Sequence, residues 1–310
     1  MEHTILSKVF LYSIFFRALL ALIKFCHMID FIIHRYLLMD SSVITTLKLS
    51  ELETNGFYDH FLHVHQPLLI TDIFNVYPAL KALNIDYIAK KYGENVIDVK
   101  VSDRSGIFTL DPETGKPYFN PARMTIKEYV RTCAIQSANK KIYAQQISIF
   151  DNIPEFKNEL QFLHYIPDYL IDSANLWLGA GGNTTALHFD GANNFFMQLF
   201  GEKKILLYSP KYFHELYPHS WKSKASHISP VDASKLDYTK YPNAIKAQKI
   251  ELTISAGSIL FLPAYWWHQV HSVNINVSIN IWCKPSMRQK MYRGYLHSLL
   301  NEIAKSSKLF

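Results

Sequence analysis

The stretch TTALHFDGANNFF, residues 184–196, decides how this sequence is interpreted. Its composition is typical of a buried strand, yet it carries His188 and Asp190 two positions apart. Side chains at positions i and i+2 of a strand point to the same face. An imidazole and a carboxylate that converge in an apolar setting are donors that hold a divalent metal. An isolated His-x-Asp pattern is more often a hydrogen-bonded pair at the end of a strand. Other residues must therefore show whether this pair binds a metal.

A third metal ligand is available in the segment LPAYWWHQV, residues 262–270. His268 would complete a set of two histidines and one carboxylate, the facial triad that leaves coordination positions open and suits non-haem Fe(II). His271 is the rival ligand, although it lies on the opposite face of a regular strand. Three more histidines fall in an expected loop and are interpreted as surface residues, namely His214, His219 and His227.

Lys203 lies on the next expected strand, EKKILLYSP, residues 202–210. A buried lysine is costly unless an anion pairs with it. Lys204 has the opposite strand parity, so one of the two lysines must face solvent. Ile205 and Leu207 share the parity of Lys203, which favours Lys203 as the inward residue. The alternative is that Lys203 is a solvated strand residue.

Two further polar side chains fit around this metal set. Thr185 precedes His188 by three residues and adds a hydroxyl, and Tyr143 adds a phenol from a separate strand. A lysine, a threonine and a tyrosine around a facial triad describe a pocket for 2-oxoglutarate. That cosubstrate chelates the iron through two oxygens and presents its far carboxylate to the lysine.

The second half of the chain predicts a mainly β fold. From residue 175 onward, short strands follow one another, separated by Gly, Pro or Asn, which indicates an antiparallel barrel or sandwich. Residues 111–121 are rich in turn formers and predict a loop or lid. Upstream, periodicity predicts strands at 66–74, 95–102 and 141–150 and helices at 85–93 and 124–135, the latter with a capping box of Thr125 and Glu128.

Three parts of the chain are expected: an N-terminal extension (1–38), a main domain (39–285) and a C-terminal amphipathic helix (286–310). In the helix, Met287, Met291, Tyr295, Leu299 and Ile303 form an apolar stripe. We expect this stripe to pack on the protein's own barrel, with a second subunit, and hence a homodimer, as the alternative.

The extension is hydrophobic, but Arg17 interrupts it and Lys24 closes it, so its apolar runs are shorter than the ~18 residues of a membrane span. It is interpreted as a membrane-associated helix, a packing helix, or a stretch outside the working protein, with translation starting at Met28 or Met39. N-terminal sequencing of the native protein distinguishes these.

Charge and cysteine content exclude other classes. The net charge of +6 divides into +2 for residues 1–38, +5 for 284–310 and −1 for the rest, so the body has no basic excess for a nucleic-acid partner. The cysteines, Cys26, Cys133 and Cys283, are scattered, which argues against a disulfide framework or zinc knuckle. A cytoplasmic location is expected, with membrane association open only through residues 1–38.

The motifs at 183–210, 256–273 and 277–283 resemble the JmjC/cupin-like 2-oxoglutarate oxygenases. Within that family they are most similar to the asparaginyl hydroxylase branch of factor inhibiting HIF. The likeness extends from residue 66 to residue 283 and rests on a T-x-x-H-x-D strand, a downstream lysine and a W-W-H strand, in one order. It implies a double-stranded β-helix, of the jelly-roll or cupin type, with flanking helices.

The resemblance also implies a role for each site residue. Fe(II) would be bound by His188, Asp190 and His268. The 2-oxoglutarate pocket would be formed by Lys203, Thr185, Tyr143, Asn194, Asn280 and Trp282. Gln145 would contact the target side chain. The implied reaction uses O₂, converts 2-oxoglutarate to succinate and CO₂, and hydroxylates a C–H bond of a protein or peptide side chain, asparagine or another.

Departures from the branch concern the substrate. Ala186-Leu187, Gly191-Ala192 and Pro230 replace its usual residues, and one C-terminal helix is expected where that branch dimerises through two. Iron and cosubstrate binding are therefore better supported than asparagine hydroxylation or dimerisation. Alternatives are hydroxylation of a tRNA base, a small molecule or a lipid, and a non-catalytic cupin-like binding protein. A non-catalytic binding protein is expected to contain no metal when it is purified.

Overall fold

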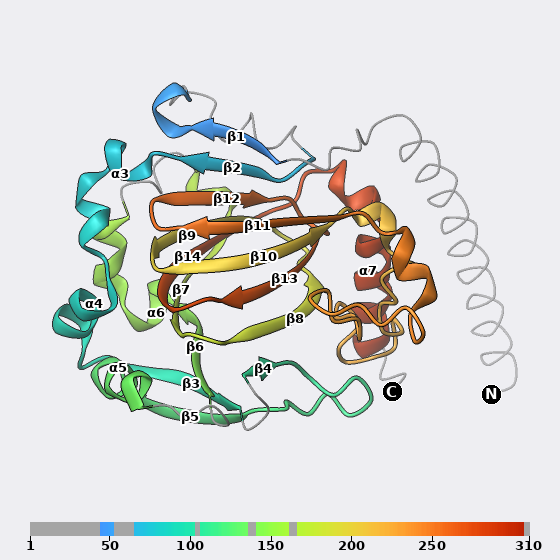
Figure 1. Cartoon of the computed structure of the whole chain (residues 1–310), viewed down its shortest axis with the longest axis horizontal. Coiled ribbons are helices and arrows are strands. Elements are labelled where there is room, and N and C mark those ends of the chain that lie inside the picture. The colour runs from blue at the N-terminus through green and yellow to red at the C-terminus, as the bar shows by residue number, and fades with distance from the viewer. Residues whose placement is uncertain (1–43, 53–64, 103–105, 136–140, 161–165, 307–310) are drawn as a thin grey trace, which may run out of the picture.

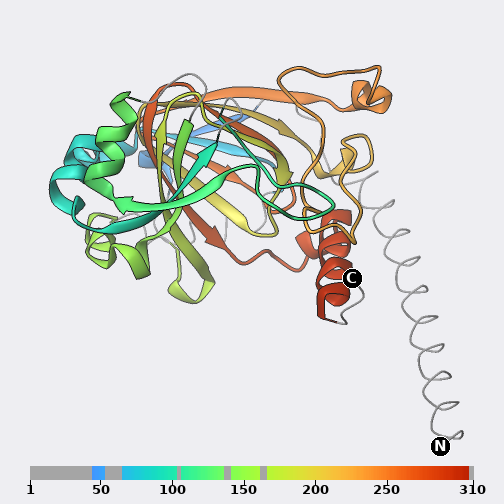
Figure 2. The same ribbon diagram turned by 90° about the horizontal axis from the view of Figure 1, so that it is seen from below.

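A computed structural model gives the fold of residues 44–52, 65–102, 106–135, 141–160 and 166–306. The expectations for residues 1–38, for Met39 as a start and for Cys26 lie outside these residues. Two β-sheets face each other at the centre of the molecule. Helices α4 and α5 lie at one end of the sheets and helix α7 lies at the other (Figures 1 and 2).

The sheets are unequal in size. The larger sheet contains, in order, β1 (Thr45–Lys48), β2 (Leu68–Thr71), β12 (Ser258–Leu262), β9 (Asn193–Phe200), β14 (Ile275–Cys283), β7 (Ile171–Ala180), β6 (Lys141–Ser148), β3 (Val96–Ser102) and β5 (Asn120–Thr125). The smaller sheet contains β11 (Lys249–Ser255), β10 (Glu202–Tyr208), β13 (Trp267–Ser272), β8 (Thr184–Phe189) and β4 (Ile107–Phe108).

The eight strands from β7 to β14 form a jelly roll. β7, β9, β12 and β14 belong to the larger sheet and β8, β10, β11 and β13 to the smaller, and all neighbours within these two groups are antiparallel. The chain therefore passes back and forth between the sheets, as in double-sheet jelly rolls. This confirms the mainly β fold of the double-stranded β-helix type.

The remaining strands extend or close this jelly roll. β6, β3 and β5 continue the larger sheet beyond β7, and β2 and β1 continue it beyond β12. β4 pairs in parallel with β8 and so attaches the preceding segment to the strand of His188. β3 and β6 bring the first half of the chain against the interior of the jelly roll.

Short helices cover the ends of the larger sheet: α3 (Ile73–Val76), α4 (Ile85–Tyr92), α5 (Ile126–Ile135) and α6 (Ile149–Asn152). The 3₁₀ turns are Leu49–Glu51, Pro78–Ala82, Pro154–Glu159, Asp168–Leu170, Pro210–Tyr212, Pro242–Lys246 and Gln289–Met291. The capping box expected before α5 is present, since Glu128 accepts the Thr125 N–H at 2.8 Å and Thr125 Oγ1 accepts the Glu128 N–H at 3.2 Å.

The apolar core has three parts. One lies between the larger sheet and the helices and includes Ile126, Phe156 and Leu176. Another lies between the two sheets, where β9, β10, β12 and β13 meet. The third, around Phe189 and Trp267, lies where the smaller sheet meets the long loop after β10 and helix α7. These clusters thus pack the larger sheet against the helices, the two sheets against each other, and the smaller sheet against the loop and α7.

Helix α7 (Arg293–Ser306) begins later than position 286. Before it, the buried Gln289 side chain accepts the Ser286 N–H at 2.7 Å and bonds to Asn193, which holds a 3₁₀ turn. The expectation that the apolar stripe packs on the barrel is wrong for most of it, because Leu299 and Ile303 are each 37% exposed. The buried residues here are instead Tyr292, just before the helix, and Asn301, which is hydrogen-bonded to Trp221.

Within the described residues, no helix combines the length and apolarity needed to cross a membrane. Cys133 and Cys283 are both buried, with free thiols.

Candidate functional site

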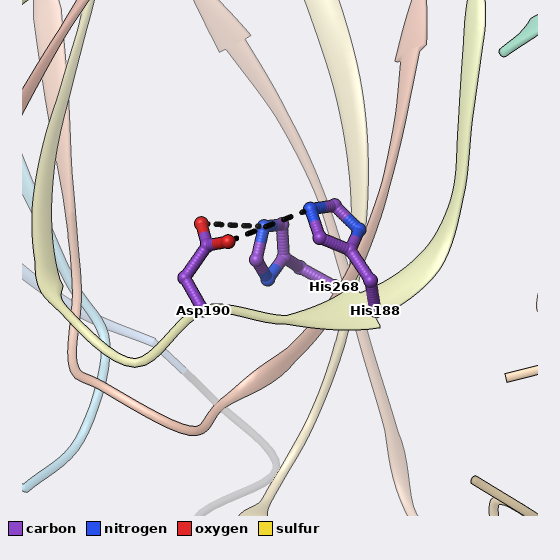
Figure 3. Close-up of side chains that lie close together, drawn as sticks. All are labelled: His188, Asp190 and His268. Carbon is purple, nitrogen blue, oxygen red and sulfur yellow. Dashed lines mark ion pairs between the residues drawn. The ribbon is translucent and has the colours of Figure 1, made fainter. Parts of the chain in front are cut away.

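His188, Asp190 and His268 meet inside the mouth of the jelly roll (Figure 3). Nε2 of His188 lies 4.0 Å from Oδ1 of Asp190, and Nε2 of His268 lies 3.6 Å from Oδ2 of the same carboxylate. The three donor atoms lie within 4.8 Å of one another. Ligands of one metal ion lie about 3 Å apart when the metal–ligand bonds are about 2.0–2.2 Å long, so these atoms are close to the spacing that a shared ion requires.

Local backbone structure orients both histidines. His188 Nδ1 donates to the Ala186 carbonyl at 2.8 Å, and His268 Nδ1 donates to the Trp266 carbonyl at 3.0 Å. These bonds select the tautomer in which each Nε2 has a free lone pair directed at the site. Asp190 follows the last residue of β8, and its own carbonyl accepts the Tyr265 N–H at 2.8 Å.

The site favours the neutral form of the His188 imidazole. Burial lowers the pKa of His188, and the neighbouring His268 lowers it further. A neutral imidazole is the form that binds a metal. Two nitrogen donors and one carboxylate on one side, with space on the other, are the donor set of a facial triad, so these residues fit Fe(II).

Lys203 is the buried cation of the cavity, with 0% of its surface exposed. Its Nζ donates to Tyr143 Oη at 3.2 Å and to Ser278 Oγ at 2.8 Å, and lies 4.8 Å from the ring centroid of Phe196. These partners are neutral, and burial lowers the lysine's pKa to about 7. A buried ammonium without a carboxylate partner is suited to receive an anionic ligand.

Lys204 points to the opposite face of the strand from Lys203, as expected for the next residue of a strand. Its side chain is 45% exposed and pairs with Glu251 at 2.5 Å. The inward position of Lys203 is therefore confirmed over the alternative of a solvated strand residue.

All of the residues expected at the site surround one cavity, which has a volume of about 270 Å³. They line it together: His188, Asp190, His268, Lys203, Thr185, Tyr143, Asn194, Asn280, Trp282 and Gln145. The cavity also contains polar groups that lack a partner among the described residues. The indole N–H groups of Trp177 and Trp282 are buried without an acceptor, and the side-chain oxygen Oδ1 of Asn280 is buried without a donor. Buried polar groups are normally satisfied, so these atoms indicate space for a polar ligand.

The alternative ligand His271 is directed away from the metal site. It is exposed, and its Nδ1 is hydrogen-bonded to Thr184 Oγ1 at 2.9 Å. The residues that depart from the hydroxylase branch lie next to the ligands, since Ala186 lines the cavity and Leu187 is fully buried behind it.

His227 was expected at the surface, and that expectation is wrong. Its ring lies 6.4 Å from the ring of His188, centroid to centroid, and it lines the cavity. The loop is held there because the Phe189 N–H donates to the His227 carbonyl at 3.1 Å. His214, by contrast, is exposed, and His219 is partly buried.

Other residues at or beside the cavity also lacked a recognisable sequence signal. Ser278, which binds Lys203, lies in a strand whose register was unknown. Lys100 and Phe119 line the cavity from the first half of the chain. Strand periodicity shows only which way a side chain points, so it could not show that β3 lies beside this cavity.

A second cavity, about 190 Å³ in volume, lies behind Asp190. It shares Asp190 and His227 with the main cavity and is bounded by Asn301, Glu302 and Lys305 of α7. The C-terminal helix therefore forms part of the surroundings of the candidate metal ligands.

Known proteins share this domain. Residues 54–289 match the model of the cupin-like domain family. The chain is 29% identical to Lysine-specific demethylase 8 of Xenopus tropicalis, over 73% of this chain and 50% of that protein. It is 28% identical to Jumonji C domain-containing protein 5 of Drosophila melanogaster, over 76% of this chain and 57% of that protein.

A third relative is matched over more of its length. The chain is 23% identical to the human tRNA wybutosine-synthesizing protein 5, over 76% of this chain and 77% of that protein. By contrast, the chain spans about half the length of the demethylase relatives. The family match covers most of the chain and includes every residue that lines the main cavity: the chain belongs to the JmjC/cupin-like domain family.

Proposed function

We propose that the protein is an Fe(II)- and 2-oxoglutarate-dependent oxygenase that hydroxylates a C–H bond of a protein side chain. The observation that carries this proposal is the arrangement of two sites in one cavity: a two-histidine, one-carboxylate set and the buried, uncompensated Lys203. The first suits iron and the second suits a distant carboxylate. A ligand that bridges the two must chelate at one end and carry an anionic group at the other, as 2-oxoglutarate does.

Each residue has a defined task in this proposal. His188, Asp190 and His268 would hold the iron. Lys203 would bind the far carboxylate of 2-oxoglutarate, assisted by the hydroxyl groups of Tyr143, Thr185 and Ser278. When bound, iron and 2-oxoglutarate supply the activation of O₂ and the oxidative decarboxylation that yields succinate and CO₂. The binding energy of the carboxylate orients the cosubstrate toward the triad.

The walls of the cavity would exclude water from this chemistry. Phe108 lies 5.5 Å from Tyr143, and Tyr143 lies 5.8 Å from Trp177, measured between ring centroids. These rings separate Lys203 from solvent and strengthen its attraction for an anion. Gln145 and Trp282 also line the cavity and would supply an amide and an indole N–H to orient a substrate.

A protein side chain is proposed as the substrate, either asparagine or another residue. The amide of Gln145 is suited to bind a polar side chain or a peptide backbone, and the charge of −1 over residues 39–283 does not favour RNA. Hydroxylation of a tRNA base is the second candidate. It is favoured by one observation, the match to 77% of the human tRNA wybutosine-synthesizing protein 5.

The test is formation of succinate from 2-oxoglutarate by the anaerobically purified protein after addition of Fe(II) and air. We expect His188→Ala and Asp190→Ala to abolish it and His271→Ala, the control, to retain it. Persistence of the full rate in both ligand variants would refute the assignment. A protein that binds neither metal nor 2-oxoglutarate would support a non-catalytic role. Mass spectrometry of candidate peptides and tRNA, for the gain of one oxygen atom, distinguishes the two substrate classes.

A further inference from the structure

The cavity contains a second lysine that the proposed chemistry does not use. Lys100 lies on β3, directly opposite Tyr143 on β6. Directly paired residues of neighbouring strands project from the same face, so Lys100 and Tyr143 extend toward the same space. Both line the main cavity.

Lys100 is half-buried without a counter-charge. Its side chain forms no hydrogen bond and no ion pair with any residue in the described part of the chain, and its Nζ lies 4.9 Å from the ring centroid of Phe119. The nearest acid on the same face of β3 is Asp98, which pairs with Arg123 at 3.3 Å. Burial lowers the pKa of Lys100, so the fold bears a cost for this ammonium that an anionic ligand would offset.

This cation is separate from Lys203. The two lysines contact different groups: the Nζ of Lys100 lies over the ring of Phe119, whereas the Nζ of Lys203 donates to Tyr143 and Ser278. The two ammonium groups therefore lie in different parts of one cavity. Among the lining residues that the structure describes, Asp190 is the single carboxylate, and it belongs to the metal set. Once a dicarboxylate occupies Lys203, Lys100 still lacks a negative partner.

We propose that Lys100 is the anion-binding subsite for the substrate and that the protein selects an acidic peptide, with an Asp or Glu near the target residue. This inference rests on the proposed function and specifies its substrate. A peptide carboxylate matches a single ammonium. The surroundings also suit a peptide, because Leu110, Phe119 and Ile228 offer apolar contacts and Gln145 offers an amide. A nucleic acid would need several cations along its phosphates.

The experiment uses the full-length protein with Fe(II) and 2-oxoglutarate under anaerobic conditions. The probes are three degenerate peptide pools of equal length, enriched in acidic, neutral or basic residues, and a short single-stranded RNA. Retention of each probe is measured by mass spectrometry. Air is then admitted and the stimulation of succinate formation is measured for each probe.

Three variants are compared with the wild type. We expect the wild type to retain the acidic pool roughly tenfold better than the basic pool. Lys100→Met keeps the packing on Phe119 and removes this preference, whereas Lys100→Glu inverts it. Lys90→Glu, the control, makes the same charge change on the exposed face of α4 and leaves the preference intact. If Lys100→Glu does not fold, as judged by its thermal unfolding, Lys100→Met carries the test.

The outcomes separate this inference from the proposed function. Equal preferences in the wild type and in Lys100→Met overturn the acidic-peptide subsite, even if succinate forms. Retention of RNA that depends on Lys100, without retention of acidic peptides, overturns it as well. A preference that depends on Lys100 without succinate formation supports the subsite and contradicts the oxygenase proposal.

Discussion

His188 and His268 are direct cross-strand partners. The antiparallel register of β8 and β13 places their Cα atoms opposite each other, and their ring centroids lie 4.1 Å apart. The register shifts immediately after this pair, between His268 and Val270. His271 pairs instead with Thr184 and takes part in a surface hydrogen bond. The metal set is thus defined by strand pairing, and not by histidine content.

His268→Ala should reduce metal affinity more than the 10- to 100-fold seen when an outer partner of a ligand is lost, because it removes a direct ligand. His271→Ala should leave the affinity unchanged. Titration of the apoprotein with Co(II), followed by absorption, measures both. Equal losses in the two variants would contradict the register-based choice of ligand.

Lys203 should make the stability of the ligand-free protein depend on pH. Its pKa is about 7 in the fold and 10.5 when unperturbed, so between these values the unfolded chain binds more protons than the folded one. The free energy of unfolding therefore rises with pH across this window, by at most about 1.4 kcal/mol per pH unit from this group. Below pH 7 the full cost of the buried charge is present.

Urea unfolding at pH 7, 8 and 9 measures this slope, with Lys203→Met as the reference that lacks the titrating group. We expect the slope of the wild type to exceed that of the variant. Addition of 2-oxoglutarate should flatten the difference, because a bound carboxylate raises the pKa of the lysine again. Parallel curves for the wild type and Lys203→Met would show that the buried ammonium is relieved in another way.

Asn194 and Asn280 should act as one unit. Asn280 Nδ2 donates to Asn194 Oδ1 at 2.9 Å, and both residues are buried. Removal of either amide leaves the other without its partner, whereas removal of both does not. A double-mutant cycle with Ala, measured by urea unfolding, should give a coupling of about 1 kcal/mol. Additive losses would mean that the pair is not coupled in solution.

Leu299 and Ile303 of α7 should contribute little to the fold of one subunit. Each is 37% exposed, so replacement of both by Glu should change the free energy of unfolding by less than about 0.5 kcal/mol per site. If this stripe contacts a second subunit, the alternative that its spacing leaves open, light scattering should show a dimer for the wild type and a monomer for the double variant. A dimer that persists in the variant would place the contact elsewhere.

Much of the site could be predicted from the alternation of side chains along a β-strand. The face shared by His188 and Asp190, and the inward position of Lys203, need only the two-residue repeat of β structure. The capping box at Thr125 and Glu128 is equally local. Such features depend on residues close together in the chain, so they can be derived from the sequence.

The errors arose where distant segments meet. His227 lies beside His188 because its loop bonds to the end of β8, and Lys100 reaches the cavity because β3 pairs with β6. Neither pairing has a local signal. The face that α7 buries depends on Asn301, whose side chain donates to the carbonyls of Trp221 and Ser223. Apolar spacing alone therefore indicated the wrong face.

The hydrogen bonds between α7 and the loop after β10 limit how far the C-terminus of this protein can be shortened. His297 Nε2 donates to the Ser226 carbonyl at 2.9 Å, and Asn301 holds the same loop five residues upstream of Ser226. That loop continues into His227, beside His188. A recombinant fragment trimmed to the family match, which ends at residue 289, would keep all three candidate metal ligands and lose this support. The smallest active unit should therefore be longer than the region of recognisable similarity.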